Sequence, residues 1–183
     1  MVQLELDDSN VDFVEREPLP DDAQAFPATL PPIPHETRVL HLDYVWSPTA
    51  RLEQWRDSAA TTPTEIEIVH TGYAVPDSEA VTDFGESADL ATDLTYVSEP
   101  GNLSLLGLEL VKFLEGSPAE EPAVVCVDSL SLMLRYASVD DVCQFVDQCC
   151  ELMDAHEAIT RFQFTPEAHD KETIERIQAQ VSK

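Results

Sequence analysis

The stretch that decides the fold reads Ala123-Val124-Val125-Cys126-Val127-Asp128-Ser129. Its first five residues are apolar without interruption. Such a run is typical of a strand that is buried on both faces, as in parallel sheets covered by helices. We therefore expect 123–127 to be a central parallel strand. Its polar end, Asp128-Ser129, should lie at the sheet edge where parallel α/β sheets bind ligands.

The segments around this strand alternate between strand-like and helix-like patterns, which predicts a parallel sheet between two helical layers, joined by right-handed crossovers. The expected fold is a three-layer α/β/α sandwich with a mainly parallel five-stranded sheet. Further strands are predicted at 38–42, 65–69, 94–97 and 159–164, and helices after Ser47-Pro48, Pro100-Gly101-Asn102, Ser138 and Thr165-Pro166.

Two acidic segments have weaker patterns. In 65–69 acids alternate with apolar residues, which favours a strand at a sheet edge with one face in solvent. The acidic stretch 76–93 is interpreted as a loop or a short helix.

The first 36 residues differ from the rest in composition. Prolines stand at positions 18, 20, 27, 31, 32 and 34, and dense proline prevents regular elements. We interpret 1–36 as an acidic, proline-rich tail and 37–183 as the domain. Two apolar patches in the tail, 11–14 and Phe26, are candidates for docking onto a partner or back onto the domain.

The charge balance limits the classes of partner. The chain has 36 Asp and Glu against 10 Lys and Arg, a formal net charge of −26. This excess disfavours nucleic acids and anionic membrane surfaces, which are bound by basic patches. It is typical of a halophilic, cytoplasmic protein, because molar salt screens charge within about 3 Å. The chain has no apolar run long enough to span a membrane and no signal peptide pattern at its start.

The four cysteines, Cys126, Cys143, Cys149 and Cys150, form no Cys-x-x-Cys pair. We expect free thiols that pack as small apolar side chains. Disulfides, or a metal site that includes His156, are the alternatives, although the spacing fits no zinc pattern. No cofactor or metal is predicted.

An apolar strand that ends in Asp-Ser resembles the second nucleotide motif of RecA-like and KaiC-like ATPases. The resemblance covers about 38–181, is best at 124–136, and is closest to small haloarchaeal RecA/KaiC-related proteins of unknown function. It implies the strand order 5-1-4-3-2. It also implies that Asp128, with Ser129, would hold a magnesium nucleotide if that function is retained.

The chain departs from this family at the phosphate loop. The family places Gly-x-x-x-x-Gly-Lys-Ser/Thr after the first strand, whereas this chain has Asp43-Tyr44-Val45-Trp46-Ser47-Pro48-Thr49. The loop has no glycine and no lysine, and Asp43 would repel phosphate. Tyr44 and Trp46 are therefore candidates to fill the crevice or to face a partner. After the second strand, His70-Thr71-Gly72 replaces the catalytic acids of the family.

Other candidate chemistry has weaker support. Asp128 alternatively caps the helix that follows its strand. His41 is expected to be a core histidine and His169 a surface residue. A nucleophile built on Ser129 lacks a Gly-x-Ser-x-Gly elbow.

The sequence thus predicts a non-catalytic, degenerate RecA/KaiC-like module that binds another protein or itself, in regulation or signalling. The alternatives are a nucleotide-binding ATPase or switch with an atypical phosphate loop and, with less support, a receiver-like signalling domain.

Overall fold

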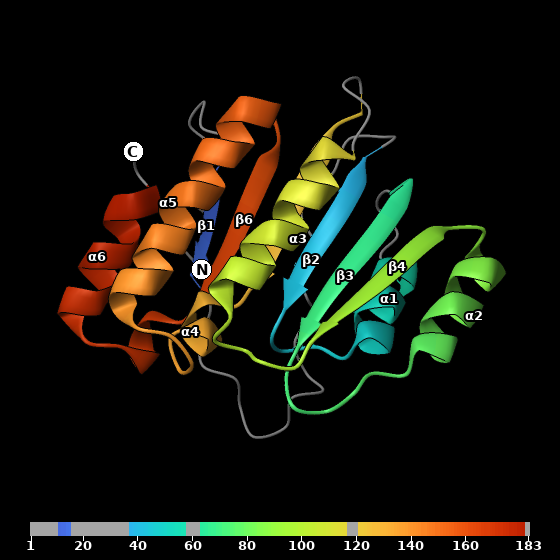
Figure 1. The fold of residues 1–183 in the computed structure, drawn as a ribbon, viewed down its shortest axis with the longest axis horizontal. Helices are drawn as coiled ribbons and strands as arrows, with labels where there is room; N and C mark the ends of the chain where they lie inside the picture. The colour runs from blue at the N-terminus through green and yellow to red at the C-terminus, as the bar shows by residue number, and fades with distance from the viewer. Residues whose placement is uncertain (1–10, 16–36, 58–62, 117–120, 182–183) are drawn as a thin grey trace.

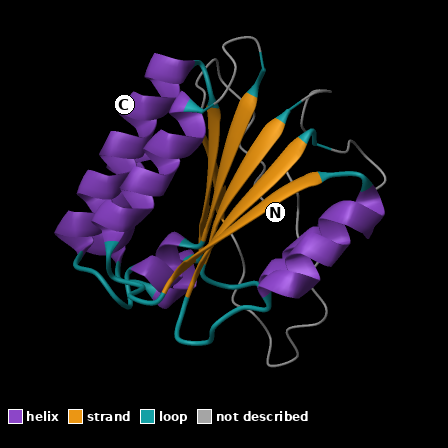
Figure 2. Ribbon diagram, turned by 45° about the vertical axis from the view of Figure 1, so that its right-hand side comes forward, coloured by secondary structure: helices purple, strands orange, loops and turns teal. Residues whose placement is uncertain are grey.

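The computed structural model describes residues 11–15, 37–57, 63–116 and 121–181. Its core is a parallel sheet of six strands that lies between two layers of helices (Figure 1). Figure 2 shows the sheet nearly edge-on, with helices on both sides. The predicted three-layer α/β/α class is therefore confirmed.

The elements follow the predicted alternation. The strands are β1 (Val11–Glu15), β2 (Arg38–Asp43), β3 (Glu65–Thr71), β4 (Ala91–Val97), β5 (Ala123–Asp128) and β6 (Ile159–Phe164). The helices are α1 (Pro48–Asp57), α2 (Ser78–Ala88), α3 (Leu103–Glu115), α4 (Leu130–Met133), α5 (Val139–His156), the 3₁₀ turn η2 (Pro166–Ala168) and α6 (Lys171–Val181).

The strands lie in the order β1-β6-β5-β2-β3-β4. With β2 counted as the first strand, the five predicted strands have the order 3-2-1-4-5. The expected order, 5-1-4-3-2, becomes 2-3-4-1-5 when counted from the opposite edge. Both orders place β5 inside the sheet, but here the first strand lies beside the second, where the expected order separates them. The observed order is that of doubly wound sheets, and its direction reverses between β2 and β5.

The sixth strand comes from the segment that was interpreted as a tail. β1 pairs with β6 in parallel, from Val11 opposite Thr160 to Glu15 opposite Phe164. The patch 11–14 therefore docks back onto the domain, and the sheet extends beyond the boundary predicted at residue 36. Phe26 and the prolines of the segment lie outside the described residues.

Two apolar clusters cover the two faces of the sheet. The larger one packs α3, α5 and α6 against Leu40, Val125 and Phe162 on one face. The smaller one packs α1 and α2 against the other face, where Leu52 and Trp55 of α1 are buried as predicted. The helices that follow β2 and β3 are therefore on the opposite side from those that follow β4 and β5 (Figure 1).

Two local expectations need correction. β3 is not a sheet edge but lies between β2 and β4. Its acids are tolerated there because Arg38 on β2 forms ion pairs with both Glu65 and Glu67. The stretch 76–93, interpreted as a loop or a short helix, holds an eleven-residue helix, α2, whose first turn is capped by Asp77, and also the first three residues of β4.

Local capping signals explain where several helices begin. Ser47 accepts a hydrogen bond from the Ala50 N–H with Pro48 in the first position of α1, Asn102 caps α3, and Ser138 caps α5. Thr165-Pro166 starts only η2, and α6 begins after Asp170, which accepts from the Thr173 N–H. No helix in the described ranges is long and apolar enough to cross a membrane.

Candidate functional site

The crevice between the ends of β2 and β5 is the natural place for a ligand in this topology. The two strands are neighbours, and their last residues, Asp43 and Asp128, lie opposite each other in the parallel register. Ligands of open α/β sheets bind outside the carboxyl ends of the strands, at the point where the strand order reverses. The contents of this crevice therefore decide what the fold can bind there.

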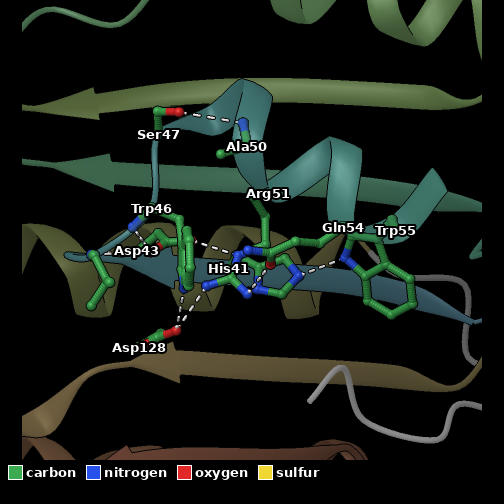
Figure 3. A network of polar contacts seen from close by, with 10 residues as sticks. His41, Asp43, Trp46, Ser47, Ala50, Arg51, Gln54, Trp55 and Asp128 are labelled. Atoms are coloured by element: carbon green, nitrogen blue, oxygen red, sulfur yellow. Dashed lines mark hydrogen bonds and ion pairs between the residues drawn. The ribbon is translucent and has the colours of Figure 1, made fainter. Parts of the chain in front are cut away.

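Arg51 occupies the crevice. It projects from α1, and its Nε donates to Asp43 Oδ2 at 2.7 Å while its Nη2 donates to Asp128 Oδ2 at 2.9 Å (Figure 3). Its Nη1 donates to Gln54 Oε1 at 3.1 Å. All three charged residues are buried, with at most 2% of each side chain exposed. Burial alone would lower the pKa of Arg51, but the two carboxylates raise it, so the guanidinium stays charged.

Trp46 lies over the same carboxylates. Asp43 Oδ1 accepts hydrogen bonds from the backbone N–H groups of Val45 at 3.1 Å and Trp46 at 2.9 Å, which hold the loop in a tight turn. The Trp46 indole Nε1 donates to Asp128 Oδ2 at 3.1 Å, and its ring centroid lies 5.9 Å from the Arg51 guanidinium carbon (Figure 3). We call Asp43, Trp46, Arg51 and Asp128 the crevice cluster.

The crevice cluster uses the groups that a phosphate would need. A phosphate site at this loop requires free backbone N–H groups and a cation. Here two loop N–H groups already donate to Asp43, and the guanidinium already bridges two carboxylates. Asp128 Oδ2 accepts from both Arg51 and Trp46. A magnesium ion at Asp128 would have to replace the charge of Arg51.

Ser129, the second residue predicted at this strand end, has a structural contact. Its Oγ accepts a hydrogen bond from the Leu132 N–H at 3.3 Å and caps α4. The peptide bond between Asp128 and Ser129 is cis. The alternative in which Asp128 caps the helix is therefore corrected: the cap is Ser129, and Asp128 pairs with α1. Ser129 is also buried, with 6% exposed, which does not suit an accessible nucleophile.

Two of the histidines near the sheet, His41 and His169, have structural contacts. His41 is buried and accepts a hydrogen bond at Nε2 from Trp55 Nε1 at 2.9 Å (Figure 3). Burial, and then the charge of Arg51, lower its pKa, so His41 is a neutral core histidine, as expected. His169 is half-buried rather than on the open surface, and it stacks on Phe164 with 5.0 Å between ring centroids.

The loops beside the crevice cluster carry exposed apolar side chains. The most exposed are Tyr73 and Val75 in the β3–α2 loop, at 79% and 80%, and Tyr136 before α5, at 43%. Tyr73 meets the Tyr136 ring edge-on at 6.2 Å between centroids. We call these three residues the aromatic surface.

Tyr44 supports this surface from inside. Its ring stacks on Tyr136 at 6.3 Å between centroids, and its hydroxyl donates to the Pro100 carbonyl at 2.7 Å. Gly101 lets the backbone of Tyr136 pack closely, since a Cβ at Gly101 would lie 2.6 Å from the Tyr136 carbonyl oxygen. Tyr44 and Trp46, the predicted crevice or partner residues, therefore both have internal contacts.

Sequence reasoning missed Arg51 and the aromatic surface. Arg51 had no local signal beyond its place in the first turns of the helix that follows an Asp-ended strand. The aromatic surface did have a local signal. Tyr73-Ala74-Val75 is an apolar segment between Gly72 and Pro76, and it is therefore expected to lie in a loop.

The cysteines lie away from this site or are buried beneath it. All four are free thiols, three of them buried and Cys150 half-buried, as predicted. Burial raises the pKa of Cys126 to about 12, which keeps that thiol protonated. Within the described ranges, no three His, Cys, Asp or Glu side chains gather as a metal site.

The comparisons with known proteins identify a family and no activity. No curated protein matches the chain. Residues 18–181, most of its length, match the family described as "Family of unknown function (DUF7504)". The chain therefore belongs to the DUF7504 family of unknown function.

Proposed function

We propose that this chain is a non-catalytic module that binds another protein, in regulation or signalling, and that its ligand crevice has been closed by its own side chains. The observation that carries the proposal is the double ion pair of Arg51 with Asp43 and Asp128, at 2.7 and 2.9 Å in a buried site. A nucleotide would have to displace it, and separating buried ion pairs typically costs about 3–5 kcal/mol.

The aromatic surface supports protein binding in place of a ligand. Tyr73 and Tyr136 are tyrosines with exposed rings, and tyrosine is enriched at the energetic centres of protein interfaces. Their rings contact each other, and Tyr136 stacks on the partly buried Tyr44, so part of the surface is held in place before a partner arrives. Preorganised aromatic side chains lose little conformational entropy on binding.

The acidic composition supports a protein that works at high salt concentration. A net charge of −26 on 183 residues would produce strong self-repulsion in dilute buffer. We therefore propose that the protein is halophilic and works in the cytoplasm of a salt-accumulating cell. The charge also disfavours nucleic acid as the partner.

Descent from RecA/KaiC-like ATPases remains part of the proposal. Asp128 at the end of an apolar central strand supports it, whereas the strand order supports it less, because the expected order does not place β2 beside β3. The alternative function is a nucleotide switch with an atypical phosphate loop. The doubly wound order, which dinucleotide-binding folds share, favours that alternative.

A capture experiment tests the proposed surface. Tagged protein is incubated with a lysate of the native host at high salt, and each captured protein is then purified and titrated directly. We expect a partner whose binding is lost when Tyr73→Ser and Val75→Ser are combined. The matched control combines Thr82→Ser and Ala88→Ser, at exposed positions of α2 that belong to neither the aromatic surface nor the crevice cluster. A partner that binds wild type and the double variant equally would contradict the assignment of this surface.

A further inference from the structure

A second binding feature lies on the opposite helical layer from α1 and α2. A groove of about 910 Å³ runs between α3 and α5. Its α3 wall includes Ser104, Gly107, Leu108 and Val111, which recur every three or four residues and so share one face of the helix. The α5 wall presents Phe145, Gln148 and Leu152 by the same spacing.

The walls of the groove are mostly apolar and partly open to solvent. Leu108 is 49% exposed, and it is one of the few large apolar side chains that are exposed in the described part of the chain. Phe145 and Cys149, on the opposite wall, are buried residues of the core. Two neighbouring helices with such a channel form the kind of groove into which the side chains of a third helix pack.

Gly107 marks the point of closest approach for such a helix. It lies in the interior of α3, where glycine is less favourable than alanine. A Cβ added at Gly107 would meet nothing within 4 Å, whereas a Cβ at Gly85 or Gly101 would lie within 3 Å of backbone oxygen atoms. Packing inside the described chain therefore does not require a glycine here. A helix packed from outside would use this gap for close contact.

The charges along the groove indicate the chemistry of that helix. Among the residues that the structure describes, its lining includes the carboxylates of Asp141 and Glu151 and contains no Lys, Arg or His. A second copy of this chain would bring the same acids and a net charge of −26 to the contact. Electrostatic complementarity therefore favours a partner whose apolar stripe is flanked by Lys or Arg.

We infer that the groove between α3 and α5 binds an amphipathic helix of another protein, with an apolar face against Gly107 and Leu108 and basic residues near Asp141 and Glu151. This site does not depend on the function proposed above, because its residues are distinct from the crevice cluster and from the aromatic surface.

Peptide titration tests the inference. The probe is a fluorescent synthetic helix of about four turns, with leucine on one face and lysine flanking it. Its matched comparison has glutamate in place of lysine. Anisotropy is measured in a salt concentration at which circular dichroism shows folded protein. We expect the lysine peptide to bind, and Gly107→Leu, which fills the groove, to weaken binding at least tenfold without lowering the melting temperature. Thr82→Leu, at an exposed position of α2 outside both the groove and the aromatic surface, should leave the affinity unchanged.

Several outcomes would overturn the inference. One is a dissociation constant of about 1 mM or more for the lysine peptide and the wild-type protein. Others are a glutamate peptide that binds equally well, or a Gly107→Leu variant with wild-type affinity. If sedimentation instead shows a dimer that Gly107→Leu dissociates, the occupant is a second copy of the chain and the basic partner is excluded.

Discussion

Arg51 Nη2 donates to Asp128 Oδ2 at 2.9 Å, and this contact joins the start of α1 to the end of the central strand β5. The same guanidinium pairs with Asp43 at the end of β2. One cation thus holds two carboxylates that would repel each other in a low-dielectric site. The closure of the crevice and the stability of the domain therefore depend on the same residue.

Arg51→Met should lower the free energy of unfolding by about 3–5 kcal/mol, because it leaves two buried carboxylates without a cation. Urea denaturation at constant salt measures the change. Arg56→Met is the matched control: Arg56 pairs with Asp57, but their side chains are 57% and 73% exposed, and loss of such a pair should change stability by less than about 1 kcal/mol.

A triple variant separates charge from packing. Asp43→Asn and Asp128→Asn, added to Arg51→Met, remove the uncompensated charges and should restore part of the lost stability. If the triple variant is as unstable as Arg51→Met alone, the packing of the arginine stem, and not its charge, holds the site together.

Trp46→Phe tests the indole contact. Phenylalanine keeps an aromatic ring but removes the Nε1 donor to Asp128. Since a hydrogen bond to a charged group contributes about 1.5–3 kcal/mol, we expect a loss near the lower end of that range for this half-buried side chain. An unchanged melting temperature for Trp46→Phe would show that the indole does not help to close the crevice.

The parts of the structure that depend on local signals were predictable from the sequence. The apolar run of β5 and the caps at Ser47, Asn102 and Ser138 each depend on a few consecutive residues, and the structure has them in place. The position of Asp128 at the ligand edge followed from the same run.

The parts that depend on contacts between distant residues were not predictable. Arg51 and Asp128 are 77 positions apart, and nothing in the helix pattern of 48–57 shows that Arg51 points inward. The strand order was hidden because β2 and β5 are both buried at every position, so their composition does not indicate their neighbours. β1 has only five residues, and the prolines after it favoured a tail.

The stability of the protein should depend on pH through His41. Burial lowers its folded-state pKa, while the unfolded chain takes up a proton near pH 6.5. The unfolded state therefore binds more protons below pH 6.5, and stability should fall there by up to about 1.4 kcal/mol per pH unit. His41→Gln keeps an acceptor for Trp55 but cannot titrate. This variant should therefore lose the contribution of His41 to the slope of stability against pH. Equal slopes for the two proteins between pH 6.5 and 5 would show that His41 does not contribute.

Deletion of residues 1–15 should destabilise the domain, because it removes β1 from the edge of β6. Each lost backbone hydrogen bond contributes about 0.5–1.5 kcal/mol, and the exposed edge would favour association between copies. Deletion of residues 1–10 is the control that leaves β1 in place. A protein without residues 1–15 that is as stable and as monomeric as this control would show that β1 does not hold the sheet edge.

The most direct test of a closed crevice is isothermal titration of the folded protein with ATP·Mg²⁺. At about 100 µM protein, we expect no heat of binding, which places any dissociation constant near or above about 1 mM. Asp128→Asn, checked for folding by circular dichroism, is titrated in parallel. A micromolar dissociation constant for the wild type that is lost in Asp128→Asn would contradict the account and favour a nucleotide switch.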